Sequence, residues 1–449
     1  MKWLKRLGVV AGVLILALAV IPFFISLSDY IPEIEKAASE RLKEPVKIEK
    51  LTLALLPVPH LSMDGITVGK ARDLTVGTVT ATPNLWSLLG TPKVIRNLEI
   101  NKLVLTQAGL DKIPQWMKSE KPDEPPAVVV QSVKLDDAVL ELGQAAFGPF
   151  DARLAMAQGG LESASIQTQD GKLKALVKPQ DREKYLIDAN AKSWKLPAGA
   201  SILFDELTIK GFASSTEANL SEIRCRLYGG TVMGKARIGY KKGLQVTGNF
   251  DVSQVEIKSL LQALGRPPSL SGRLTARPVF SASAATAEQL LNALRLETPF
   301  DVQNGVLHGV DISKAATSLI SKDGGKGGET RFDKLSGHLV VERGTRRLTR
   351  LNIASGSLSA DGSVTVSPRD ELSGKINAKV TAASVASATV PLNVAGTVQS
   401  PLLYPTGGTV TGAAIGTAIA GPLGTGVGAK VGQWAEGMFG GGQNEKKKR

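Results

Sequence analysis

The residues that most often carry enzyme chemistry are few in this sequence and lie far apart. Its three histidines, His60, His308 and His338, show no metal-ligand spacing such as H-x-x-x-H and none lies near the single cysteine. There is no G-x-S-x-G nucleophile motif, and no Gly-Lys pair is followed by Ser or Thr as a phosphate-binding P-loop requires. The sequence therefore predicts no catalytic residue, no metal site and no cofactor.

Two further features contain reactive side chains but lack a second catalytic group. Asp136 and Asp137 are neighbouring carboxylates, yet adjacent strand residues point to opposite faces and cannot easily act on one bond. Cys225 lies between Arg224 and Arg226, which would lower the pKa of an exposed thiol. No base accompanies it, and a lone cysteine excludes an internal disulfide. We therefore predict a protein that is not an enzyme.

The charge of the chain points to an anionic partner. The formal net charge is +13, so nucleic acid must be considered. The basic residues are spread thinly, however, and the only dense run is the tail at 446–449. No cluster combines arginine with stacking aromatic residues. Anionic lipid headgroups therefore suit this charge better than nucleic acid does.

An apolar stretch at the N-terminus predicts a membrane anchor. Residues 7–27 contain no charge, and about 21 helical residues span a hydrocarbon core. Lys2, Lys5 and Arg6 precede the stretch, which predicts a cytoplasmic N-terminus and a body on the other side. A cleaved signal peptide is the alternative, but the apolar run continues past the cleavage-like Ala19. The predicted anchor residues include Leu7, Leu14, Ile15, Leu16, Ile21, Phe23 and Phe24.

The elements after the anchor are predicted to be mostly strands. Ile31, Ile34, Ala38 and Leu42 recur at helical spacing, either as a collar at the bilayer or as packing on the first strands. From Val46 the period changes to two, and short helices are expected at 84–89, 255–264 and 287–296. Tight antiparallel turns are predicted at 170–171, 242–243, 343–344 and 361–362. The predicted regions are an anchor (1–28), a helix and β region (29–118), a proline-rich linker or loop (119–126), a β body (127–402) and a glycine-rich end (403–449).

The glycine-rich end is compatible with two structures. Glycine recurs every four residues at Gly408, Gly412 and Gly416, which lets two helices approach closely. This spacing predicts a glycine-zipper hairpin on or in a membrane. The alternative is a flexible tail.

The strand alternation predicts a sheet with one apolar face. Such a face must be covered, either by its own curling into an apolar gutter or by a second layer that forms a dry core. Aromatic residues are scarce and the expected helices are short, and the pattern alone does not exclude either arrangement. The candidate lining residues are Leu244, Val246, Phe250, Val252, Ile376, Val380, Val390, Leu392, Val394 and Val398.

Several segments in this order resemble the AsmA family. The N-terminal part resembles it at 45–48, 55–61 and 65–69, after the anchor and an acidic helix. The C-terminal part resembles it at 298–307, 309–311, 330–337, 360–362, 391–397 and 400–401. The resemblance covers nearly the whole chain and carries no catalytic residues.

The resemblance implies a single-pass inner-membrane protein of Gram-negative bacteria with a periplasmic body, concerned with outer-membrane biogenesis. It also implies a taco-like elongated antiparallel β-sheet whose apolar groove carries lipid between membranes, as in chorein-like bridge proteins. The expected partners are phospholipids, lipopolysaccharide precursors and envelope proteins that complete a bridge. The alternative is an assembly factor that binds strands of outer-membrane proteins by edge addition.

Overall fold

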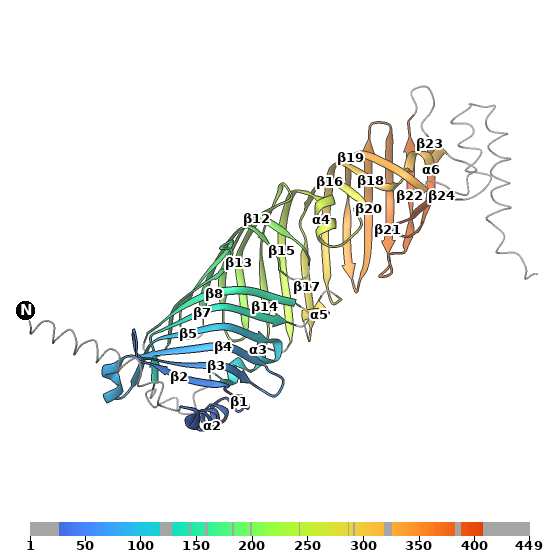
Figure 1. Cartoon of the computed structure of the whole chain (residues 1–449). Coiled ribbons are helices and arrows are strands. Elements are labelled where there is room, and N and C mark those ends of the chain that lie inside the picture. The colour runs from blue at the N-terminus through green and yellow to red at the C-terminus, as the bar shows by residue number, and fades with distance from the viewer. Residues whose placement is uncertain are drawn as a thin grey trace, which may run out of the picture. The chain divides into compact units, whose positions relative to one another are not determined.

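The computed structural model describes residues 27–116, 128–142, 145–157, 160–181, 184–197, 200–241, 243–285, 287–290, 292–317, 326–381 and 388–406. These residues form 24 strands and a few short helices (Figure 1). The prediction of a mainly β protein is therefore confirmed. The chain divides into two compact units: the described residues up to 199 with Lys210–Ser214 form the first, and Ala200–Ile209 with those from Ser215 onward form the second.

The first unit contains eleven strands of the described chain and the first helices. The strands are β1 (Val46–Lys47), β2 (Lys50–Ala54), β3 (His60–Val68), β4 (Leu74–Pro83), β5 (Lys93–Thr106), β6 (Val128–Val130), β7 (Ser132–Leu142), β8 (Ala145–Ala157), β9 (Gly160–Thr168), β10 (Leu173–Pro179) and β11 (Tyr185–Lys195). The helices are η2 (Ser28–Tyr30), α2 (Ile31–Leu42), η3 (Leu85–Leu89) and α3 (Gln107–Trp116).

Two parallel strand pairings in this unit correct the prediction of a wholly antiparallel sheet. Strand β5 pairs in parallel with β6, with Lys93 opposite Val128, and in parallel with β7, with Leu98 opposite Val133. A parallel neighbour needs a crossover that returns the chain to the same end of the sheet. Helix α3 lies in this connection, and residues 117–127 fall outside the described part of the chain.

Helix α2 packs on the first strands, which was one of the two roles predicted for it. Ile31, Ile34, Ala38 and Leu42 contact a small core centred on Val46, Ile48 and Val68. An ion-pair bridge fastens α3 beside it, because Lys112 Nζ donates to Glu44 Oε1 at 2.5 Å and to Asp73 Oδ2 at 2.8 Å. The two carboxylates raise the pKa of Lys112 through these hydrogen bonds. Helix packing therefore closes this end of the first unit.

The second unit contains the remaining strands. They are β13 (Glu217–Leu227), β14 (Gly230–Gly239), β15 (Leu244–Glu256), β16 (Leu270–Ala276), β17 (Val279–Ala284), β18 (Arg295–Val310), β19 (Lys326–Glu342), β20 (Thr345–Ser355), β21 (Leu358–Val366), β22 (Leu372–Val380), β23 (Ala388–Gly396) and β24 (Pro401–Pro405). Its helices are α4 (Ile257–Ala263), α5 (Ala287–Leu290) and α6 (Ile312–Thr317). Strand β12 (Leu203–Ala213) contributes residues to both units.

The predicted turns agree with the structure at three places and fail at one. Gly171, Gly243 and Gly344 all have positive φ at strand ends, and Arg343 and Gly344 together form the left-handed pair of a tight hairpin. The turn predicted at 361–362 is wrong, because both residues lie inside β21. A Cβ on Gly362 would lie 2.2 Å from Lys375 O, so the close approach of β22 explains this glycine.

Three predicted segments lie outside the described residues. They are residues 7–26 of the anchor, the linker at 119–126, and residues 407–449 of the glycine-rich end. Among the helices that the structure does describe, none combines the length and apolar character needed to cross a membrane.

Candidate functional site

Strand β15 separates apolar and polar side chains onto two faces. Leu244, Val246, Phe250 and Val252 are half-buried on one side with Gly248, whereas Gln245, Thr247, Asn249 and Asp251 are exposed on the other. Their antiparallel neighbours continue the row, since Val246 lies opposite Ile238 of β14 and Ala282 of β17. We call the side that carries these residues the apolar face of the second unit. It includes four of the predicted lining residues.

Two phenylalanine rings lie flat on this apolar face. Phe250 and Phe280 stack with ring centroids 5.4 Å apart and an interplanar angle of 14°. Each ring covers a glycine of the adjacent strand: a Cβ on Gly234 would meet Phe250 at 2.4 Å, and one on Gly248 would meet Phe280 at 2.7 Å. Aromatic rings that cover cross-strand glycines restore the packing that the missing side chains would provide. The rings consequently run along the sheet instead of projecting from it.

The C-terminal part of the same unit is closed. Helix α6 lies beside the last strands (Figure 1) and contacts β19, β22, β23 and β24. Its Ile312, Ala315 and Ala316 are almost fully buried. Strand β24 lies against β18 and β19, so the sheet turns back on itself here. Gly309 of β18 faces Pro401 of β24 across this closure. The result is a hydrophobic core of buried side chains.

The remaining predicted lining residues belong to this closed part. Ile376, Val390, Leu392 and Val394 are buried in its core, and Val380 packs against it. Val398 is half-buried in the turn between β23 and β24. The predicted set is therefore not one surface: the structure brings its β15 members together on the uncovered face and its C-terminal members together in the core. Their role as lipid contacts stays a prediction.

The first unit has an apolar face of its own. Strands β9, β10 and β11 pair so that two rows of small and branched residues run across them. One row is Ala164, Val177 and Ile187, and the other is Ile166, Ala175 and Ala189. Apart from the buried Ala164, these side chains are half-buried, and Lys174, Leu176 and Lys178 are exposed on the opposite face of β10. Sequence analysis did not single out this face, although the alternation in β10 would have revealed it.

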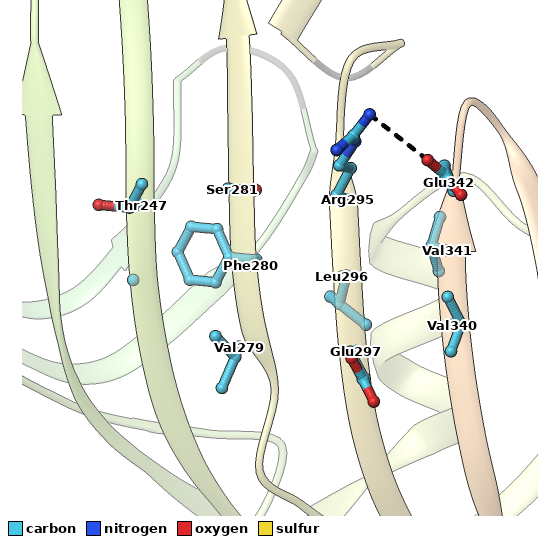
Figure 2. A pocket seen from close by; sticks show the side chains of 11 residues that line it. Thr247, Val279, Phe280, Ser281, Arg295, Leu296, Glu297, Val340, Val341 and Glu342 are labelled. Atoms are coloured by element: carbon cyan, nitrogen blue, oxygen red, sulfur yellow. Dashed lines mark ion pairs between the residues drawn. The ribbon is translucent and has the colours of Figure 1, made fainter.

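The second unit also has a hollow of about 470 Å³ over β15, β17, β18 and β19. Figure 2 shows the side chains in rows, with Phe280, Leu296 and Val341 between a row containing Arg295 and one containing Glu297. The row of Phe280, Leu296 and Val341 continues from Gly248 of β15 and belongs to the apolar face, whereas the two outer rows belong to the opposite face. Arg295 Nη2 lies 3.5 Å from Glu342 Oε1.

The three histidines have structural roles. His308 Nδ1 lies 2.9 Å from Glu329 Oε1, and His338 Nε2 lies 2.8 Å from Glu297 Oε1. His60 Nδ1 lies 2.8 Å from the carbonyl of Val58. Within the described chain, no group of three or more His, Cys, Asp or Glu side chains could hold a metal ion.

The Cys225 thiol is not activated by the two arginines beside it in the sequence. It is buried on the apolar side of β13, and burial raises its pKa to about 11. The flanking Arg224 and Arg226 point to the exposed side, where they pair with Glu222 at 3.3 Å and Glu206 at 3.8 Å. Their charges therefore do not activate the thiol. The loss of hydration disfavours the thiolate instead.

The comparison with protein families decides the assignment. A sequence model described as the AsmA family matches residues 126–367, which is more than half of the chain. The chain belongs to the AsmA family. No curated protein and no solved structure matches it. The matched residues include β7 to β20 and thus the uncovered apolar face around β15. AsmA-family membership and the large β-sheet together fit a role in biogenesis of the cell envelope.

Proposed function

We propose that this protein binds phospholipids or related envelope lipids on its apolar faces and transfers them between the inner and outer membrane without enzymatic chemistry. The observation that carries the proposal is the uncovered face of β15, where half-buried apolar side chains and two flat phenylalanine rings are open to an apolar ligand. An acyl chain placed there would be stabilised by about 25 cal/mol per Å² of apolar surface removed from water.

The charges suit the same ligand. The apolar side of β15 carries no charged residue from Leu244 to Val252, and its opposite side carries Asp251. The basic residues lie on the neighbouring strands, as Lys235 and Arg237 of β14 and Arg273 of β16. A lipid could therefore bury its acyl chains while its headgroup remains near water and basic side chains. Lipid flow would follow a gradient or be driven by a partner protein that completes the bridge.

The proposed location follows from the sequence. Residues 7–27 would hold the chain in the inner membrane by one span, with a cytoplasmic N-terminus and a periplasmic body. The basic residues Lys2, Lys5 and Arg6 before the apolar stretch support this orientation.

Site-specific photocrosslinking in the bacterial envelope tests lipid binding without removing the anchor. A benzophenone amino acid at Phe250 places the reactive group on the apolar face, and the same group at Asn249 places it on the exposed face of the same strand. We expect mass spectrometry to detect phospholipid adducts at position 250 and few at position 249. Equal lipid adducts at both positions would contradict the proposal. Adducts of unfolded outer-membrane proteins at position 250 would instead favour the assembly-factor alternative.

A further inference from the structure

The connection between β4 and β5 presents two large apolar side chains to solvent. Trp86 and Leu89 of η3 are 86% and 88% exposed. A 3₁₀ helix has three residues per turn, so positions 86 and 89 lie on the same side of it. Leu85 is exposed as well. Large apolar side chains exposed together in this way commonly mark an interaction surface.

Hydrogen bonds hold this connection in its exposed form. Ser87 Oγ donates to the carbonyl of Asn84 at 2.7 Å, and Val94 N donates to Ser87 Oγ at 2.9 Å. Asn84 N donates to the carbonyl of Val94 at 2.8 Å, which closes the base of the connection. Ser87 therefore fixes the turn while Trp86 and Leu89 take no part in the packing below it.

The neighbouring connection adds to the same edge of the sheet. Residues 55–59 join β2 to β3, and the pairs Ala54–His60 and Leu61–Ala81 place this loop beside the end of β4. Leu56 is 38% exposed and Val58 is 49% exposed. Together, residues 55–59 and 84–92 form what we call the apolar tip.

The charged residues in the strand segments next to the apolar tip are basic, which favours an anionic partner. Residues 51–63 and 74–98 contain no Asp or Glu, and the charged residues in these stretches are Lys93 and Arg96. An apolar surface whose adjoining strand segments carry basic and no acidic residues complements an anionic bilayer. Tryptophan favours the boundary between headgroups and acyl chains, where its ring is buried and its N–H finds a polar partner.

We infer that the apolar tip inserts into the interface of the bilayer that holds the anchor, as a second membrane contact of the first unit. This inference rests on the proposed inner-membrane location. Only residues 28–45 separate the predicted anchor from β1, so the first unit stays near that bilayer. Insertion would fix the orientation of the unit relative to the membrane, which a single point of attachment does not do.

Fluorophore labelling of the full chain in proteoliposomes tests the tip. Leu89→Cys places a cysteine at the tip, and Ala71→Cys places one in the exposed turn at the opposite end of β3 and β4. Each would be made in a Cys225→Ser background, labelled with an environment-sensitive dye, and reconstituted in vesicles of phosphatidylethanolamine and phosphatidylglycerol that contain nitroxide-labelled lipid. We expect the dye at position 89 to be quenched at least twofold more than the dye at position 71.

The alternative outcomes are decisive. Equal and weak quenching at both positions, in vesicles where protease protection shows an inserted anchor, would overturn tip insertion. Equal and strong quenching would also overturn it, since the whole unit would then adsorb without a preferred contact. Neither outcome bears on the crosslinking at Phe250, so failure of the tip and failure of lipid binding remain distinguishable.

Discussion

A carboxylate on the uncovered apolar face should abolish lipid occupancy without unfolding the protein. Val246 is the best position, because it is half-buried at the middle of the apolar row of β15. The neighbouring Gln245 is exposed on the other face of the same strand and provides the matched control. We therefore compare Val246→Glu with Gln245→Glu, which add the same charge one residue apart.

The expected loss follows from two contributions. A lipid that completes the burial of Val246 gains about 1 kcal/mol at this side chain, because roughly half of a full valine burial remains to be made. A carboxylate at the same place must be desolvated or protonated, which costs about 2 kcal/mol more. A total of about 3 kcal/mol corresponds to a roughly 100-fold weaker affinity for lipid.

Quantitative mass spectrometry of bound lipid checks this expectation. Both variants keep the same predicted anchor, so any lipid that surrounds it contributes equally to each and cancels in the comparison. Circular dichroism and thermal melting confirm that each variant is folded. A folded Val246→Glu protein that retains as much lipid as Gln245→Glu would refute the assignment of the face.

Three further outcomes are expected. Leu392→Ala should lower the free energy of unfolding by about 2–5 kcal/mol, because Leu392 is fully buried, whereas Leu176→Ala at an exposed position should change it little. Urea denaturation measures both free energies, and equal effects would contradict the closed core. Gly248→Ala should lower the free energy of unfolding by about 1–3 kcal/mol in the same assay, since its Cβ would meet the Phe280 ring at 2.7 Å and the carbonyl oxygen of Lys235 on the adjacent strand. An unchanged urea midpoint would show that the ring is free to move. Cys225 should react slowly with a disulfide reagent at pH 8 unless the protein is unfolded. Its pKa is raised from 9.0 to about 11, so the unfolded thiol ionises first and stability should fall between these pH values relative to Cys225→Ala.

The elements with strong local signals were predictable. The helical spacing of Ile31, Ile34, Ala38 and Leu42 indicated α2, and the period-two pattern of β15 indicated its two faces. These signals depend on residues a few positions apart. Prediction was weaker where short elements depend on distant contacts, as for α3 and α6. The hydrogen bond from Lys314 N to Asp311 Oδ1 shows that Asp311 caps the start of α6, and this capping residue was a signal in the sequence that could have been used.

The environment of an alternating strand was not predictable from its pattern. Val390, Leu392 and Val394 alternate as regularly as Leu244 and Val246, yet the first three are buried and the last two are half-exposed. Alternation shows that a strand has one apolar face, but it contains no information about what covers that face. Coverage depends on α6 and on β24 reaching β18, both of which are contacts between residues far apart in the chain.

The closed part of the second unit supplies the stability that its uncovered part lacks. A sheet with one solvent-exposed apolar face gains little from burial there and needs stability from elsewhere. The core around Ile312, Leu392 and Val302 provides it within the same unit, and consecutive antiparallel pairings connect that core to β15 through β16 and β18. The apolar residues of β15 are only half-buried, so the exposed part of their side chains can serve binding. Substitutions in the core should therefore change stability first, and substitutions on β15 should change occupancy first.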